Sequence, residues 1–227
     1  MGQEKKKSRM PQIGEAVFCI GYLIFDLIAA IIFFMNADGN HVSRLFGVLT
    51  LVLGVGDAFH LVPRIIKAFC GDSPAIEWWS GLGLMVSSIT MTVFYVLLFY
   101  IWKAIFTEVT YPSILSVLVW GSAAIRILLC LFPQNNWFHA EGNQVWGIYR
   151  NLPFAVTGLC LVILFFVSGN TGGYGLWRMS IAIIISFACY FPVVLLAKKK
   201  PMIGMLMIPK TIAYLWMIRM GLGLIGK

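Results

Sequence analysis

Seven apolar runs dominate this sequence, and each is long enough to cross a lipid bilayer as a helix. A membrane-spanning helix needs about 20 mostly apolar residues, and short breaks rich in polar residues, Gly, Pro or Asn separate the runs. A transmembrane β-barrel would instead need short segments of alternating polarity. We therefore predict an all-α, polytopic integral membrane protein, a bundle of seven transmembrane helices. The predicted spans are 13–35, 44–68, 79–103, 112–132, 144–167, 176–197 and 202–225.

The balance of apolar and charged residues supports the same class. With 60% hydrophobic and 11% charged residues, the chain has too little polar surface to cover a soluble globule. We expect a basic tail over 1–12 and a single transmembrane domain over 13–227. The net charge of +8 does not indicate nucleic-acid binding, because Lys and Arg lie mostly at helix ends, without a basic groove interleaved with aromatic residues. Five scattered cysteines without a Cys-x-x-Cys pair predict free thiols.

The distribution of basic residues predicts how the bundle is oriented. Cytoplasmic loops of membrane proteins carry an excess of Lys and Arg. We therefore expect the N-terminus in the cytoplasm and the C-terminus outside. The larger basic set then lies inside: Lys5, Lys6, Lys7, Arg9, Arg64, Lys67, Lys198, Lys199 and Lys200, against Arg44, Lys103, Arg178, Arg219 and Lys227 outside. Six tryptophans near helix ends are predicted to anchor at the membrane interfaces: Trp78, Trp79, Trp102, Trp137, Trp146 and Trp177.

Four ionisable side chains are predicted to lie deep in the membrane: Asp26, Asp57, Arg126 and Lys210. A charge near the bilayer centre costs roughly 2.5–3.5 kcal/mol on insertion scales, so each needs a partner, a wet cavity or a role. Counted along the helices, Asp57 and Lys210 lie roughly 15 Å from the cytoplasmic helix ends, and Arg126 roughly 10 Å. The polar groups therefore converge on the half of the bundle that is predicted to face the cytoplasm.

Helical periodicity brings more polar residues onto the same faces. In the second run, Asp57, His60 and Arg64 are spaced i, i+3 and i+7 and share one stripe. In the first run, Glu15, Cys19, Tyr22 and Asp26 share another. Prolines at 63, 153 and 209 each free a backbone carbonyl that can line a cavity. The predicted ligand-binding residues are Asp26, Asp57, His60, Arg64, Arg126, Arg150, Asn151, Lys210 and Tyr214.

The excess of cationic donors in this set favours an anionic ligand. Arg64 and Arg150 add positive charge near the cytoplasmic rim, and cationic donors suit a phosphate, a carboxylate or an anionic headgroup. We predict a membrane binding or transport protein with a cytoplasm-facing polar cavity for a small anionic or amphipathic solute. In this hypothesis Asp57 and His60 carry a coupled proton, since histidine titrates near neutral pH, or they set the charge balance of the cavity. Membrane lipid is a further expected partner, and association of the chain with its own copies stays open.

Two other functions fit the same residues. An intramembrane enzyme acting on a lipid headgroup would use His60 as general base and Asp57 as its orienter, with no obvious nucleophile beside them. A sensor or assembly subunit would use the buried charges for packing alone, with Asp26 and Asp57 paired to Lys210 and Arg126. The sequence favours the binding or transport function over both.

No metal ion or other cofactor is expected. A catalytic zinc site needs three protein ligands. His41 and His139 are predicted to lie in loops on opposite sides of the membrane, which excludes a site made of the three histidines.

Four segments carry a resemblance to known proteins: 56–64 (GDAFHLVPR), 133–137 (PQNNW), 149–151 (YRN) and 208–211 (IPKT). They resemble those of an uncharacterised group of bacterial seven-helix membrane proteins. This likeness spans nearly the whole chain, implies the inner membrane of a bacterium and implies no activity. His60 with Asp57 is also similar, more faintly, to part of the pattern of the adiponectin receptor and alkaline ceramidase superfamily, which implies zinc-dependent hydrolysis near the cytoplasmic leaflet. Lys210 and Tyr214 occupy the spacing of the paired histidines on the last helix of that superfamily.

Overall fold

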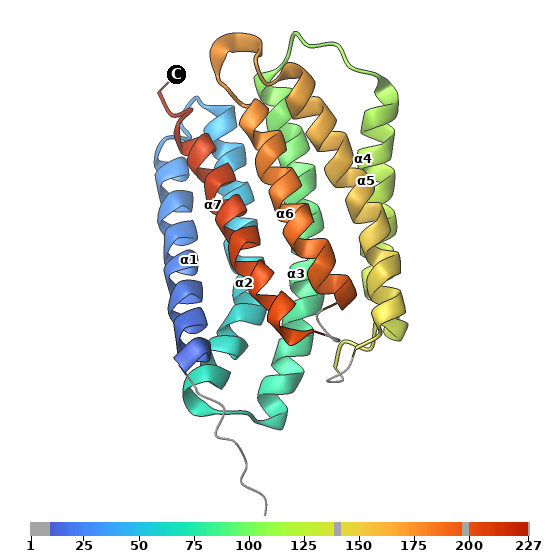
Figure 1. The fold of residues 1–227 in the computed structure, drawn as a ribbon. Helices are drawn as coiled ribbons and strands as arrows, with labels where there is room; N and C mark the ends of the chain where they lie inside the picture. Colours follow the sequence, from blue (N-terminus) through green and yellow to red (C-terminus); the bar gives the residue numbers. More distant parts are fainter. Residues whose placement is uncertain (1–9, 139–141, 197–199, 227) are drawn as a thin grey trace, which may run out of the picture.

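The computed structural model of the protein describes residues 10–138, 142–196 and 200–226, and all regular structure within these ranges is helical. Seven long helices make up the bundle (Figure 1), as the sequence predicts. They are α1 (Met10–Met35), α2 (His41–Cys70), α3 (Pro74–Ile105), α4 (Ser113–Leu131), α5 (Gln144–Ser168), α6 (Trp177–Leu196) and α7 (Met207–Leu222). Three short 3₁₀ helices connect them: η1 (Pro133–Asn135), η2 (Thr171–Gly173) and η3 (Pro201–Leu206).

The seven helices form a closed ring in chain order. Around the ring each helix contacts the next one along the chain, and α3 also contacts α5. The ring closes where α7 packs against α1 and α2, while α4 packs against α3 and α5. Because the helices alternate in direction, α1 begins at one end of the bundle and α7 ends at the other, where the C-terminus is marked (Figure 1).

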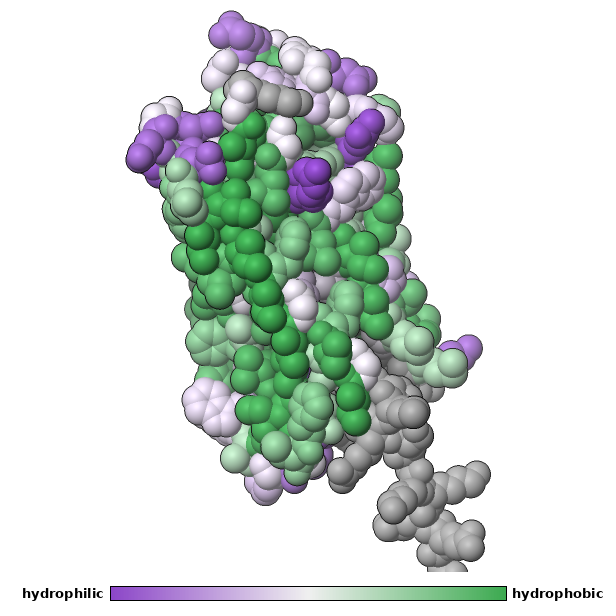
Figure 2. All heavy atoms as spheres, turned by 90° about the vertical axis from the view of Figure 1, so that its left-hand side faces the viewer, coloured by the Kyte–Doolittle hydropathy of each residue, from purple (hydrophilic) through white to green (hydrophobic). Residues whose placement is uncertain are grey.

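The outer surface of the bundle is a broad apolar belt. Figure 2 shows hydrophobic side chains covering the middle of the molecule, with hydrophilic groups gathered mainly toward its upper end. Large apolar residues on this surface are more than half exposed, among them Val17, Leu128 and Phe166. Exposure of so much apolar surface to water is unfavourable, whereas its contact with lipid hydrocarbon is not. The belt and the seven apolar helices together indicate a multi-pass membrane protein.

Helices α2 and α3 begin a few residues earlier than predicted because each has a side-chain cap. Asn40 accepts a hydrogen bond from the backbone N–H of Ser43 at 3.0 Å, and Ser73 accepts one from that of Ile76 at 3.3 Å. Such caps satisfy N–H groups that have no partner within the helix. Pro74 follows the second cap at the first helical position, where its missing N–H does no harm.

The last span differs from the prediction of one continuous helix over 202–225. Its first turns form the 3₁₀ helix η3, and the α-helix begins only at Met207. Pro209 explains the break, because proline inside a helix lacks an N–H and its ring clashes with the carbonyl four residues earlier. Near the start of α7 it meets no such carbonyl of the same helix.

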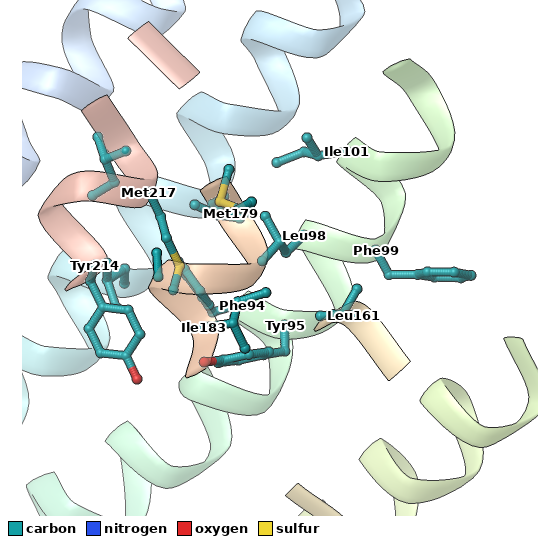
Figure 3. Packing of buried hydrophobic residues seen from close by; sticks show 14 of the residues in the cluster. Phe94, Tyr95, Leu98, Phe99, Ile101, Leu161, Met179, Ile183, Tyr214 and Met217 are labelled. Atoms are coloured by element: carbon teal, nitrogen blue, oxygen red, sulfur yellow. The ribbon is translucent and has the colours of Figure 1, made fainter. Parts of the chain in front are cut away.

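An apolar core fills the half of the bundle toward the C-terminus. Figure 3 shows side chains of α3, α5, α6 and α7 meeting there, including Leu98, Leu161 and Ile183. Trp102 belongs to this core and is not an interfacial anchor, which corrects the prediction from its place near a helix end. It is 1% exposed, and its indole N–H donates to the hydroxyl of Ser168 at 2.6 Å. The other half of the bundle holds most of the buried polar groups discussed below.

Candidate functional site

Asp57 lies in a hydrogen-bonded cluster where α1, α2 and α3 meet. Tyr22 of α1 donates its hydroxyl proton to Oδ2 of Asp57 at 2.8 Å, and Ser87 of α3 donates to Oδ1 at 2.9 Å. His60, one turn later on α2, places Nδ1 at 3.9 Å from Oδ1, which is beyond hydrogen-bonding distance. Asp57 is only 8% exposed. Two neutral hydroxyls therefore hold this carboxyl group, and no basic group of the described residues bonds to it closely.

Glycines let α2 and α3 approach each other closely enough to form this cluster. A Cβ atom at Gly83 of α3 would overlap the backbone carbonyl of Phe59, and one at Gly56 of α2 would overlap a side chain of α3. The Phe59 carbonyl is the one that Pro63 leaves without a helical N–H partner. The close contact covers this break in α2 and places Ser87, one turn along α3, beside the carboxyl group.

Arg126 of α4 is buried in the bundle without an ionic partner. It is 1% exposed, and the centre of its guanidinium lies 3.2 Å from the ring centre of Phe154 on α5. Its Nε and Nη1 atoms are shielded from solvent and have no hydrogen-bond acceptor among the described residues. No carboxylate in the described part of the chain forms an ion pair with it. Phe154 therefore supplies a cation–π contact but leaves these two donors of the guanidinium unsatisfied.

Lys210 of α7 is the second cation without a carboxylate partner. Its Nζ lies 4.9 Å from the ring centre of Tyr190 and 5.2 Å from that of Tyr214. Within the described ranges no ion pair joins it to an acid. The pairing of Asp26 and Asp57 with the buried bases, weighed as a packing alternative, is therefore not formed.

Two small cavities lie on either side of His60 and Lys210. The side chains of both residues line both cavities. The cationic cavity, of about 70 Å³, is lined by His60, Leu84, Ser87, Ser88, Met91, Arg126, Phe154, Tyr190, Met207, Lys210 and Tyr214. The acidic cavity, of about 30 Å³, is lined by Glu15, Phe18, Cys19, Tyr22, Asp57, His60, Leu61, Arg64, Met207, Ile208, Lys210 and Thr211. The lining of the cationic cavity thus contains two cations and no carboxylate, whereas that of the acidic cavity contains two carboxylates together with Arg64 and Lys210.

Tyrosine hydroxyls increase the number of free donors around the cationic cavity. The hydroxyl groups of Tyr95 and Tyr214 are buried and lack a hydrogen-bond partner within the described ranges. In Figure 3 the two hydroxyl oxygens lie at the same edge of the apolar core, and that of Tyr95 points toward the side where Tyr214 lies. Tyr190 is fixed differently, because its hydroxyl donates to Oδ1 of Asn151 at 3.0 Å. Asn151 therefore acts behind the cavity wall by positioning Tyr190.

The remaining predicted arginines lie outside the cationic cavity. Arg64 is half exposed and forms an ion pair with Glu15 at 3.2 Å, at the rim of the acidic cavity. Arg150 donates to Oδ1 of Asn135 at 2.8 Å and lies over the ring of Trp137, 4.1 Å from its centre. Arg150 therefore ties α5 to the loop after α4 and does not line either cavity.

Asp26 is set apart from the other predicted residues. It is 1% exposed, and neither carboxyl oxygen has a hydrogen-bond partner in the described part of the chain. It lines a groove between α1 and α2 together with Leu27, Gly54 and Val55, and it belongs to neither of the two cavities.

Several features of the site were not predicted from the sequence. Ser87 was not predicted, because a serine inside an apolar helix carries no distinctive signal. The hydrogen bond from Tyr22 to Asp57 and the pair between Arg64 and Glu15 join different helices. The basic clusters at 5–9 and 198–199 and the loop residue His139 lie outside the described residues.

No group of three or more His, Cys, Asp or Glu side chains close enough to hold a metal ion occurs among residues 10–138, 142–196 and 200–226. All five cysteines are free thiols, as predicted. Comparison of the chain with family models, with curated proteins and with solved structures gives no match. The functional argument therefore rests on the geometry of the site.

Proposed function

We propose that the protein binds a small anionic solute, or the anionic group of an amphipathic one, in the cationic cavity, and moves it across the membrane. The observation that carries this proposal is the fully buried Arg126, whose Nε and Nη1 have no acceptor. A buried charged donor that lacks a partner is costly, so native proteins rarely keep one without a role. An anion would supply the missing acceptors.

The other walls of the cavity fit the same ligand class. Lys210 adds a second cation, and the hydroxyl of Tyr214 adds a neutral donor without a partner. Charge-assisted hydrogen bonds from such groups to carboxylate or phosphate oxygens are stronger than neutral ones. A volume of about 70 Å³ suits a few water molecules or one small anionic group, so the cavity favours a compact solute or a single headgroup.

His60 and Asp57 fit a role in proton coupling. His60 lines both cavities, so a proton on its ring affects the anion on one side and Asp57 on the other. Its Nδ1 is buried and unpartnered, 3.9 Å from Asp57. A small rotation of the ring would bring the two groups into contact, which suits a pair that exchanges a proton during a transport cycle.

We further propose that the end of the bundle with the two cavities, called the site end below, faces the cytoplasm in a bacterial inner membrane, with the N-terminus inside and the C-terminus outside. Arg64, Lys67 and Lys200 lie at that end, and the positive-inside rule supports the assignment. Cys70 offers a test, because it is exposed at the site end of α2. A membrane-impermeant maleimide should label it in inverted vesicles and not in intact cells, with Cys70→Ser as the control. Labelling from the outside would reverse the orientation.

Anion binding is tested directly on purified protein in detergent. Small carboxylates and inorganic phosphate should raise the unfolding temperature of the wild type and have no effect on Arg126→Gln. Arg219→Gln is the matched control, because Arg219 is exposed in the last turn of α7, away from the cavity. Equal responses of Arg126→Gln and the wild type would remove the cavity from the binding site.

Transport is tested after reconstitution into proteoliposomes with a pH-sensitive dye inside. An anion that binds should drive proton movement in the wild type, and Asp57→Asn should abolish this movement while the protein keeps its helicity. Unaltered proton flux in Asp57→Asn would exclude Asp57 from coupling.

A second candidate function is hydrolysis of a lipid ester or amide with His60 as general base. The observation in its favour is that Asp57, held by Tyr22 and Ser87, faces the ring of His60 as an orienting acid would. Turnover of added lipid that disappears in His60→Ala would support this function. Turnover that persists in the variant would remove His60 from the mechanism.

A further inference from the structure

A groove on the lipid-facing side of α1 and α2 has Asp26 in its lining. It has a volume of about 170 Å³. Leu27, Leu51 and Val55 line it and are each more than 40% exposed on the apolar surface, so that acyl chains of the bilayer can reach it. An ionisable group that lines a lipid-accessible groove is unusual, because charges inside membranes normally face the protein interior or water.

The carboxyl group of Asp26 is buried and has no partner. It is 1% exposed, and neither oxygen accepts a hydrogen bond from any residue that the structure describes. Gly54 makes room for it, since a Cβ atom there would lie 3.1 Å from Cβ of Asp26 and 3.5 Å from its Oδ2. The hydroxyl of Thr50, the other polar group of the groove, already donates to the carbonyl of Phe46 at 2.8 Å. Nothing in the groove can therefore stabilise a carboxylate anion.

Two titratable groups, Tyr22 and Asp57, face Asp26 from the elements around it. Tyr22 precedes Asp26 by one turn on α1 and donates its hydroxyl proton to Asp57 of α2. Neither Tyr22 nor Asp57 is basic. Lys210 of α7 lies beyond Tyr22, where it lines the acidic cavity and not the groove. The charge of an ionised Asp26 would thus be unbalanced on every side.

We propose that Asp26 is a proton-binding site that is reached from the membrane and is separate from the cationic cavity. The proton is the occupant that the groove can accommodate, because a neutral carboxylic acid avoids the penalty for an unpaired charge in apolar surroundings. Tyr22 stands between Asp26 and Asp57, so the proton bound at Asp26 is electrostatically coupled to the charge of the acidic cavity. This inference does not depend on anion binding by Arg126.

A hydrophobic carbodiimide tests the proposal on the full chain in detergent or liposomes. Only a protonated carboxyl group reacts: its proton passes to a carbodiimide nitrogen, its oxygen adds to the central carbon, and the product rearranges to a stable N-acylurea without loss of atoms. Mass spectrometry of peptides should locate this adduct at Asp26. The rate should fall by roughly tenfold per pH unit once the pH exceeds the ionisation midpoint of the group.

Three variants and a second reagent give the test its controls. Asp26→Asn should lose the adduct, and Gly54→Ala should slow its formation severalfold by narrowing the groove. Asp57→Asn should keep the adduct at residue 26. A water-soluble carbodiimide should react far more slowly, since the groove opens to lipid.

The outcomes separate this proposal from the transport proposal. The proton-site proposal would be overturned if Asp26 stays unmodified under acidic conditions. It would also be overturned if the rate of adduct formation does not change from about pH 5 to about pH 9. Equal rates with the two reagents would place the access route in water. Arg126→Gln should still form the adduct, so a failure of anion binding leaves the result at Asp26 unaffected.

Discussion

Replacing Arg126 by methionine should stabilise the ligand-free protein against unfolding. The guanidinium is 1% exposed, and its Nε and Nη1 lack acceptors. Methionine is an unbranched chain of adaptable shape, so it can fill much of the same volume beside Phe154. The substitution removes the unsatisfied donors and keeps the apolar contact.

The expected gain follows from two opposing contributions. A buried donor without an acceptor costs about 1–3 kcal/mol, so the two donors cost about 2–6 kcal/mol. Loss of the desolvated cation–π contact with Phe154 removes about 2 kcal/mol of stabilisation. The free energy of unfolding of Arg126→Met should therefore exceed that of the wild type by about 2 kcal/mol.

A bound anion should cancel this difference in the free energy of unfolding between Arg126→Met and the wild type. At a hundredfold excess over its dissociation constant, a bound anion stabilises the wild type by about 2.7 kcal/mol and Arg126→Met not at all. The assay is equilibrium unfolding in mixed micelles, followed by tryptophan fluorescence, with and without the anion. Arg219→Met is the control, and its free energy of unfolding should change by less than about 0.5 kcal/mol. A marked loss of stability in ligand-free Arg126→Met would refute the reasoning, because it would mean that the guanidinium has partners.

Three substitutions test the packing around the site through the same free energy of unfolding. Ser87→Ala should lower it by about 1.5–3 kcal/mol, because it removes one of the two hydrogen bonds to the carboxyl group of Asp57. Gly83→Val should lower it by about 1–3 kcal/mol through a clash with the α2 backbone, whereas Gly121→Val, with open space around its Cβ position, should have little effect. Trp102→Phe should lower it by about 1 kcal/mol through loss of the indole hydrogen bond.

Matched variants exist for the other two substitutions. Ser88→Ala is the control for Ser87→Ala, because the hydroxyl of Ser88 bonds only to a carbonyl of its own helix. Trp78→Phe is the control for Trp102→Phe, since Trp78 is 46% exposed. Equal losses in Ser87→Ala and Ser88→Ala would contradict the hydrogen bond to Asp57. An unchanged stability of Trp102→Phe would contradict the buried position of its indole.

The number of helices, their approximate spans and their polar stripes could be predicted from the sequence. These properties depend on residues that are close together in the chain: the length of an apolar run, a proline or asparagine at its end, and the spacing of polar residues along one face. The stripe of Tyr22 and Asp26 on α1 is buried in the bundle, and that of Asp57 and His60 on α2 lines the cavities.

The partners of these stripes depended on the rotation and approach of neighbouring helices, which no local pattern encodes. Gly83 brings α3 against α2, and this contact selects Ser87 as the partner of Asp57. Arg126 and Arg150 look alike in the sequence, yet one is buried beside a cavity and the other is stacked on a loop. Asp26 is separated from the cavities because its side of α1 meets α2 across a lipid-facing groove. Such differences arise only when seven helices pack at once, since a small rotation of one helix moves a side chain from one compartment to the next.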